Sequence, residues 1–171
     1  MLFALNRPLA LKPGTQESIL LRGAVIEDAS HLREWKNAQR QFFFFNEEIS
    51  EGMQARWMSA YFERPDDYMF IVEQNGRAVG CVGLRFDEGR GDIYNVILGD
   101  PALRGGGIMS LALRAVLTFG RKHSENIGLK VLKTNPAVGF YARNGLSQVA
   151  ERDNYYEMKV DWQRFEPVAI E

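Results

Sequence analysis

The chain has 171 residues, of which 46% are hydrophobic and 25% are charged, and this is the size and balance of one globular domain with a full core. Its formal net charge of -1 supplies no positive field to gather DNA or RNA, so nucleic acid is excluded as a first choice of partner. Cys81 is the only cysteine, which excludes an internal disulfide and a thiolate metal cluster, and favours a reducing, cytoplasmic location without a bound metal.

The chain divides into a short arm, one domain and a short tail. Polar residues and prolines interrupt the apolar residues of the first 18 positions, so this stretch is expected to be an irregular arm and neither a signal peptide nor a membrane span. We expect a single domain over residues 19–162 and a C-terminal tail over residues 163–171.

The first elements alternate between strand and helix patterns. The apolar run over residues 18–25 predicts a strand, and Asp28 is a suitable N-cap for a helix from about Ala29 to Asn37 that buries Leu32 and Trp35. Four phenylalanines follow at 42–45.

A second helix is expected after Ser50, which can cap it, and before Pro65, which can end it. Four of its residues recur at the spacing of one buried face, namely Met53, Trp57, Ala60 and Tyr61.

Three consecutive strands are predicted next. The β-rich runs 68–73 and 77–86 flank Asn75-Gly76, which is a strong hairpin signal. A second turn over residues 87–91 leads into a strand-like segment over residues 92–98. Together they form an antiparallel meander.

A glycine run, Gly105-Gly106-Gly107, lies between the last of these strands and an amphipathic helix predicted over residues 108–123. Free N–H groups at a helix start, the helix dipole and the absence of side chains favour an anion there, and Arg104 adds a positive charge. The same glycines also fit an ordinary flexible turn. A P-loop is excluded because Gly-Lys-Ser/Thr is missing, and a dinucleotide fold is disfavoured because the loop follows an antiparallel meander.

The last part of the chain predicts a strand over residues 127–132, a short helix over 136–144 that Gly145 ends in the left-handed conformation, and one or two closing strands over 147–160.

The order of these elements and two motifs resemble the GCN5-related N-acetyltransferase (GNAT) superfamily from Ile19 to Val160. The resemblance implies an α/β fold with a mixed sheet of six to seven strands, an antiparallel N-terminal meander, about four helices and coenzyme A in a cleft between central strands. The family's coenzyme A loop is matched by Arg104 and Gly107, whereas Met109 stands where the family has Gly or Ala.

The second motif lies in residues 131–146 and is similar to the family's Asn, Ala, Phe-Tyr, Gly-Phe stretch. The family's asparagine usually precedes the tyrosine by seven residues, whereas Asn135 precedes Tyr141 by six and Thr134 takes the usual place. Either Asn135 or Thr134 is expected to contact the pantetheine. Tyr141 is the expected general acid at the leaving sulfur.

The resemblance implies that the backbone near Ile97 and Leu98 polarises the thioester carbonyl. The full set of cofactor-binding residues that it implies is Ile97, Leu98, Arg104, Gly105, Gly106, Gly107, Ile108, Met109, Thr134 and Asn135.

The acceptor side is less well specified by the sequence. Glu48 and Asp92 are candidates for the base that removes a proton from the amine. Phe44, Phe45 and Glu47 are candidates for binding the acceptor, although the phenylalanines also suit packing under the first helices or a homodimer contact.

The expected activity is acetyl transfer from acetyl-coenzyme A to a primary amine of a small molecule. Short matches favour the branch that acetylates nucleotide-linked amino sugars, with protein N-terminal amines as the alternative. A non-catalytic module that binds acyl-coenzyme A or a protein also stays open, because Met109 and the position of Asn135 depart from the family pattern.

Overall fold

A mixed eight-stranded sheet forms the centre of the protein, in the order β1-β2-β3-β4-β5-β6-β8-β7. This computed structural model describes residues 9–10 and 18–170. The strands are β1 (Leu9–Ala10), β2 (Ile19–Gly23), β3 (Asp67–Gln74), β4 (Arg77–Asp87), β5 (Arg90–Leu98), β6 (Ile127–Leu132), β7 (Leu146–Glu151) and β8 (Tyr155–Val160). Seven of these strands are longer than two residues, so the predicted mixed sheet of six to seven strands is confirmed; β1, at one edge, has only two residues.

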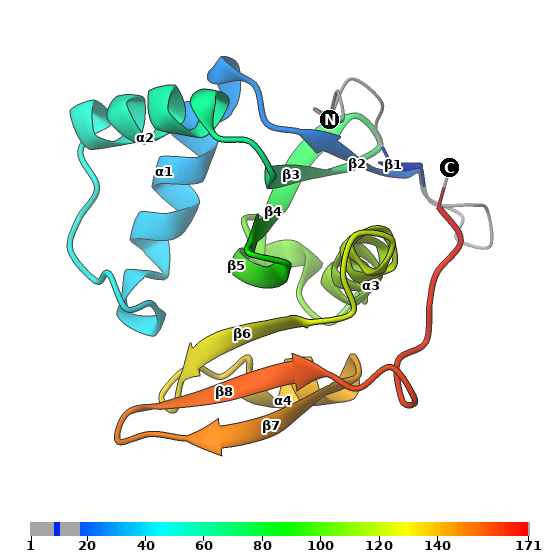
Figure 1. The fold of residues 1–171 in the computed structure, drawn as a ribbon. Helices are drawn as coiled ribbons and strands as arrows, with labels where there is room; N and C mark the ends of the chain where they lie inside the picture. The colour runs from blue at the N-terminus through cyan, green and yellow to red at the C-terminus, as the bar shows by residue number, and fades with distance from the viewer. Residues whose placement is uncertain (1–8, 11–17, 171) are drawn as a thin grey trace.

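Four α-helices cover the two faces of the sheet, as predicted. They are α1 (Ala29–Ala38), α2 (Glu51–Glu63), α3 (Ile108–Arg121) and α4 (Val138–Arg143). Helices α1 and α2 lie together on one side of the meander, and α3 lies on the other side (Figure 1). None of the helices in the described part of the chain is both long and apolar enough to cross a membrane.

Tight hairpins build the meander that the sequence predicted. Asn75 and Gly76 both have positive φ, 49° and 79°, which is the backbone of a type I′ turn. Glu88 and Gly89, with φ of 47° and 77°, repeat this turn between β4 and β5. Strands β3, β4 and β5 are therefore antiparallel neighbours, and β2 also pairs antiparallel with β3.

Strands β5 and β6 form the only parallel pair of the described sheet, and they pair over a short distance. Their register contains Gly91 opposite Ile127 and Asp92 opposite Gly128, after which the strands diverge. On its other side, β5 has an irregularity opposite β4 between Cys81 and Gly83, where Asn95 takes a φ of 48°. One edge of β5 beyond Asp92 is thus left without a strand partner.

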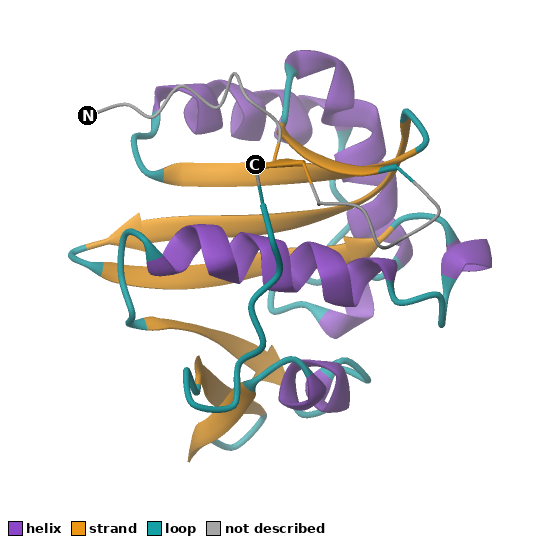
Figure 2. Ribbon diagram, turned by 90° about the vertical axis from the view of Figure 1, so that its right-hand side faces the viewer, coloured by secondary structure: helices purple, strands orange, loops and turns teal. Residues whose placement is uncertain are grey.

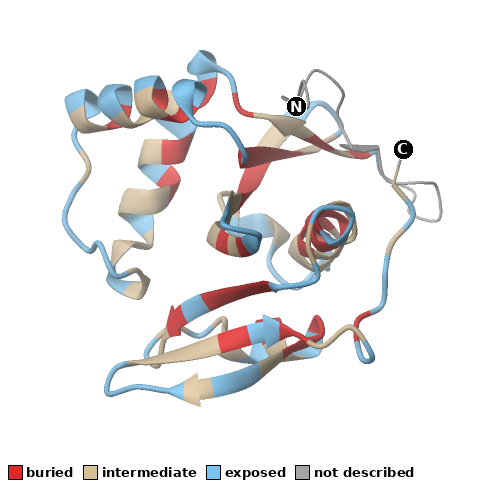
Figure 3. Cartoon of the chain, in the orientation of Figure 1, coloured by how far each residue is buried: buried red, intermediate tan, exposed pale blue. Residues whose placement is uncertain are grey.

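The core is divided by the sheet into two clusters. Alternation along β3 sends Phe70 and Val72 towards α3, and Met69 and Ile71 towards α1 and α2. The buried residues lie mainly where the meander meets these helices (Figure 3). Both faces of the central strands are therefore covered, which explains their nearly continuous apolar sequence.

Two expectations for the first helices need correction. Asp28 does not cap α1 with its side chain; it ends a 3-10 turn, where its buried carboxylate binds Arg22 and accepts a hydrogen bond from the Val25 N–H at 2.8 Å. In α2, Ser50 does cap Met53 N at 3.2 Å, but the fully packed residues are Gln54, Met58 and Tyr61.

The predicted α2 face was therefore rotated by about one residue. The half-buried Met53 and Trp57 border a cavity, and Trp57 also packs against the edge of the core.

The terminal segments lie against the domain where they are described. Most of the arm predicted over residues 1–18 lies outside the described residues, but Leu9–Ala10 pair with β2. The segment after residue 162 crosses α3 (Figure 2): Arg114 Nε donates to the Glu166 carbonyl at 2.7 Å, and Phe165 is buried. This tail is packed as part of the domain.

Candidate functional site

Two cavities lie along β5, one on each side of a shared boundary. The larger, of about 620 Å³, lies where β6 diverges from β5. It is lined by Lys36, Phe42, Phe43, Phe44, Phe45, Arg90, Asp92, Ile93, Tyr94, Asn95, Val96, Leu129, Lys130, Val131, Leu132, Asn135, Tyr141 and Tyr155. A short parallel pairing followed by divergence thus opens the sheet between its central strands, as the resemblance implied.

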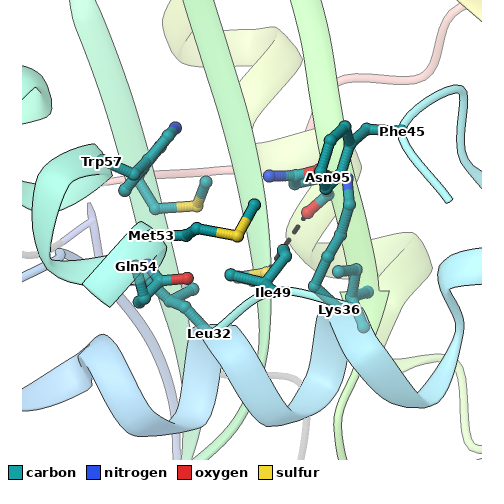
Figure 4. A pocket seen from close by; sticks show the side chains of 11 residues that line it. Leu32, Lys36, Phe45, Ile49, Met53, Gln54, Trp57 and Asn95 are labelled. Atoms are coloured by element: carbon teal, nitrogen blue, oxygen red, sulfur yellow. Dashed lines mark hydrogen bonds between the residues drawn. The ribbon is translucent and has the colours of Figure 1, made fainter. Parts of the chain in front are cut away.

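The smaller cavity, of about 260 Å³, lies between α1, α2 and the meander (Figure 4). Its lining is Leu32, Lys36, Phe45, Ile49, Met53, Gln54, Trp57, Met69, Cys81, Asn95 and Ile97. The connection between α1 and α2 covers it and is held by Asn37, which donates to the Ile49 carbonyl at 3.0 Å and accepts from the Ile49 N–H at 2.8 Å.

Lys36, Phe45 and Asn95 line both cavities. The Lys36 ammonium donates to Asn95 Oδ1 and lies 3.7 Å from the centre of the Phe43 ring. The Lys36 and Asn95 side chains are neighbours in Figure 4. Burial lowers the pKa of Lys36 to about 8, because the charged form loses hydration that these contacts do not replace. Sequence reasoning missed Lys36 and Asn95, since their meeting joins residues 59 positions apart.

The irregular backbone of β5 brings Asn95 to this boundary. Its carbonyl accepts a hydrogen bond from Cys81 Sγ at 3.2 Å, and its side chain accepts from Lys36. Cys81 is buried in β4, and burial raises the pKa of its thiol to about 12. The thiol is therefore neutral and structural at physiological pH.

Tyr141 is the buried member of α4 that borders the larger cavity, and its exposed fraction is 6%. Its ring packs against Phe140, and its hydroxyl has no hydrogen-bond partner among the described residues. Burial raises the pKa of Tyr141, so its phenol keeps its proton at neutral pH.

Asn135, and not Thr134, faces the larger cavity. Asn135 lines it, donates to the Phe42 carbonyl at 3.3 Å and accepts from Ala137 N at 2.9 Å. Thr134 is exposed and lines neither cavity. The shifted asparagine therefore occupies the wall of the cleft and ties α4 to the phenylalanine segment.

The glycine loop leads into α3 with an open backbone. Gly105 and Gly107 have φ of 83° and 80°, and no described residue accepts a hydrogen bond from the N–H of Gly107, Ile108 or Met109. Arg104 is exposed and has no ion pair within the described chain. The loop lies outside both cavities described above.

Met109 points into the protein and away from this loop surface. Its side chain packs against the α3 core cluster, and its sulfur lies 3.1 Å from where a Cβ on Gly80 would stand. Gly80 thereby makes room for the larger side chain, so the departure from Gly or Ala leaves the backbone N–H groups accessible.

The acidic candidates differ in whether they line a cavity. Asp92 lines the larger cavity at the point where β5 and β6 part, and burial raises the pKa of its carboxyl against the opposing effect of Arg90, Arg85 and Lys130. Glu47 and Glu48 are exposed and line neither cavity; Glu48 lies 3.9 Å from Arg40.

The remaining sequence candidates are divided between the two cavities. Phe44 lines the larger one and Phe45 lines both, although both rings are about half exposed. Ile97 lines the smaller cavity, and Leu98 lines neither while its carbonyl accepts from Gln39 Nε2 at 2.9 Å. The stretch of β5 in the larger cavity is instead Asp92 to Val96. No cluster of three metal-ligating side chains occurs in residues 18–170.

Residues 30–146 match the family model described as the acetyltransferase (GNAT) family. The chain belongs to the GNAT acetyltransferase family. The match spans α1 to α4 and therefore includes every element that borders the two cavities except β8. No curated protein matches the sequence.

Solved structures of other proteins share this fold at low sequence identity. An uncharacterised protein from Bacillus halodurans is similar with a TM-score of 0.77 and 14% identity over 92% of each chain. FdhC, a nucleotide-linked sugar GNAT in its apo form, has a TM-score of 0.68 and 22% identity, covering 87% of this chain and 88% of its own.

A third similar structure contains the cofactor. RimL, the ribosomal L7/L12 alpha-N-protein acetyltransferase in complex with coenzyme A, has a TM-score of 0.65 and 20% identity over 86% of this chain and 94% of its own. Coenzyme A is thus a ligand of GNAT proteins with this fold.

Proposed function

We propose that this GNAT protein transfers an acetyl group from acetyl-coenzyme A directly to a primary amine of a small molecule. The observation that carries the proposal is the placement of the Tyr141 phenol in the cavity between the diverging β5 and β6, next to a second cavity. Two adjacent cavities that share Lys36, Phe45 and Asn95 in their walls suit a direct transfer, in which donor and acceptor must approach each other.

The residues present fit the cofactor. The unpaired N–H groups at the start of α3 and the exposed Arg104 suit a diphosphate, because they combine a helix N-terminus with a guanidinium. Asn135 offers an amide in the wall of the cleft, where pantetheine would run. When bound, acetyl-coenzyme A supplies the acetyl group as an activated thioester.

Tyr141 holds the proton that the leaving sulfur requires. Its phenol is neutral because burial raises its pKa, and no described acceptor competes for its hydrogen. A thiolate has an ordinary pKa near ~8.5, so proton transfer from Tyr141 Oη depends on close placement in the site.

The free edge of β5 supplies the polar environment for the carbonyl. Since β6 leaves β5 after Asp92, the backbone from Ile93 to Val96 borders the larger cavity without a strand partner on that side. Backbone N–H groups held in a sheet are preorganised donors, which is what an oxyanion needs. This moves the proposed donors slightly upstream of Ile97 and Leu98.

Two groups are placed to receive the proton of the acceptor amine. Asp92 lines the larger cavity where β5 and β6 part, and Lys36 lines both cavities. Because burial lowers its pKa to about 8, part of Lys36 is neutral near physiological pH and able to accept a proton. We add Lys36 to Asp92 as a proposed base.

The comparisons raise two classes of acceptor. FdhC is a nucleotide-linked sugar GNAT, and RimL acetylates a protein N-terminal amine. The short sequence likeness to sugar-amine members makes a nucleotide-linked amino sugar our first candidate. The RimL similarity supports a protein N-terminal amine as the second.

Calorimetry with acetyl-coenzyme A, using ATP and NAD as controls, tests the proposal together with a thiol-release assay. We expect selective binding that is weakened at least tenfold by Arg104→Glu, because the change reverses the charge at the diphosphate. Tyr141→Phe should keep this affinity and lower the transfer rate about 10²- to 10⁴-fold, as for loss of a general acid. Arg56→Glu, the same change at an exposed arginine of α2 that forms no ion pair within the described chain, serves as the matched control.

If acetyl-coenzyme A binds but no amine is acetylated, the protein is a non-catalytic module that binds the cofactor. Absence of acetyl-coenzyme A binding would remove the proposal altogether.

A further inference from the structure

The smaller cavity has an apolar wall and very little charge. Seven of its lining side chains are large and apolar: Leu32, Phe45, Ile49, Met53, Trp57, Met69 and Ile97. Its polar side chains are Gln54, Asn95, Lys36 and the neutral Cys81 thiol. Removing apolar surface from water is therefore the main source of binding free energy that this wall offers a ligand.

The absence of a carboxylate from this lining limits the charge of the ligand. Glu47 and Glu48 belong to the covering connection, yet neither lines the cavity. The one cationic side chain, Lys36, also repels a second positive charge. Polyamines and other polycations need acidic partners, so this wall disfavours them.

The orientation of a bound amine follows from where the cavities meet. Lys36 and Asn95 stand at the shared boundary, while Met53 and Trp57 of α2 line the part formed by the first two helices (Figure 4). An amine that reaches the larger cavity must place its nitrogen near Lys36 and Asn95. Its body then lies against the apolar wall of α1 and α2.

We propose that the smaller cavity selects acceptors in which the primary amine is carried by a compact apolar body. The volume of about 260 Å³ accommodates roughly nine non-hydrogen atoms, since a water-sized atom group occupies about 30 Å³ in a liquid. This inference rests on the proposed acetyl transfer, and it replaces the nucleotide-linked amino sugar as first candidate acceptor by an amine with an apolar body. A fully hydroxylated amino sugar would bury hydroxyls against Met53, Trp57 and Leu32, where they lose hydrogen bonds to water.

A series of unbranched amines from propylamine to octylamine measures the apolar contact directly. With acetyl-coenzyme A at saturation, kcat/KM should rise about three- to fourfold for each added methylene until the cavity is filled. Glucosamine and spermidine should be at least tenfold poorer than hexylamine. A flat series, or preference for glucosamine or spermidine, would overturn the inference.

Variants on α2 locate the effect. Met53→Glu should reduce the gain per methylene to less than twofold while leaving the affinity for acetyl-coenzyme A unchanged, because Met53 does not line the larger cavity. Ala55→Glu places the same charge on the exposed side of α2 and should keep the full series. An unchanged series in Met53→Glu would place the amine elsewhere.

Equilibrium binding of the same amines, followed by calorimetry, separates this inference from the proposed function. The dissociation constant should fall three- to fourfold per methylene even in Tyr141→Phe. Binding with this dependence but without transfer in the unaltered protein would refute the acetyltransferase proposal alone. Transfer without the dependence would refute the apolar selection alone.

Discussion

Replacement of Lys36 by Met tests whether this residue receives the proton of the acceptor amine. Lys36 has a pKa of about 8, whereas a simple alkylamine acceptor has a pKa near ~10. With Lys36 as the base, the reacting pair is neutral Lys36 and the protonated acceptor. The value of kcat/KM should then rise tenfold per pH unit up to about pH 8 and stay level up to the acceptor's pKa.

Without a base, only the small neutral fraction of the free amine reacts. In Lys36→Met, kcat/KM should therefore keep rising from pH 7 to the acceptor's pKa, with no break near pH 8. At pH 8 we expect the rate to be about 10²- to 10⁴-fold below that of the unaltered protein, the usual range for loss of a general base. Lys36→Arg keeps the positive charge but cannot lose its proton, so it should follow the Met variant.

The assay is thiol release with hexylamine from pH 6 to 10. The other titratable groups lining the two cavities are Cys81, Tyr94, Asp92, Arg90, Lys130, Tyr141 and Tyr155. Burial places the pKa of Cys81 at about 12 and raises that of Tyr94 and Tyr141, so these three should not produce a break near pH 8. A break near pH 8 that persists in both variants would refute the role of Lys36, and loss of activity in Asp92→Asn alone would assign it to Asp92.

Three further predictions concern stability and are measured by urea unfolding. The pKa of Lys36 lies below its ordinary value, so the penalty for burying its charge is complete below pH 8 and disappears as the pH rises to about 10.5. Lys36→Met should therefore raise the unfolding free energy at pH 7 by up to about 3 kcal/mol. A gain in unfolding free energy that does not shrink at high pH contradicts this cause. Gly83→Ala should lower the unfolding free energy by about 1 to 3 kcal/mol, because a Cβ there would lie 2.6 Å from the Tyr94 ring. In a protein that already carries Tyr94→Ala, the same Gly83→Ala change should lower the unfolding free energy much less. Asp67→Asn should cost about 3 kcal/mol, since the fully buried carboxylate binds Arg64, Arg85 and the Tyr94 hydroxyl, and a loss below 1 kcal/mol would show that these partners are solvated instead.

Local sequence signals were reliable where the chain itself creates the structure. Asn75-Gly76 predicted its hairpin because the turn needs two successive residues with positive φ, and Asn and Gly adopt positive φ more readily than other residues. Ser50 predicted the start of α2 because its hydroxyl bonds a backbone N–H three residues away. Gly145, with φ of 90°, ended α4 as predicted.

Predictions failed where a side chain had two suitable partners. The sequence makes Asp28 a helix cap, but Arg22 at the end of β2 forms two hydrogen bonds with it, and a charge-assisted pair is the stronger interaction. The buried face of α2 was displaced because Met53 and Trp57 are apolar enough for the core yet border a cavity. Periodicity reports which residues are apolar, and it does not report where packing is incomplete.

The sequence by itself determined the family, the mixed sheet and the glycine loop before α3, because each follows from motifs or patterns within about twenty residues. The role of Tyr141 as general acid stays a prediction. Only the tertiary structure decided that Asn135 and not Thr134 faces the cleft, that Met109 packs inward over Gly80, and that Lys36 meets Asn95 between two cavities. The physical reason is the divergence of β6 from β5 together with the irregular turn of β5 at Asn95, since both depend on contacts between distant segments. Burial, which lowers the pKa of Lys36, exists only after those segments have come together.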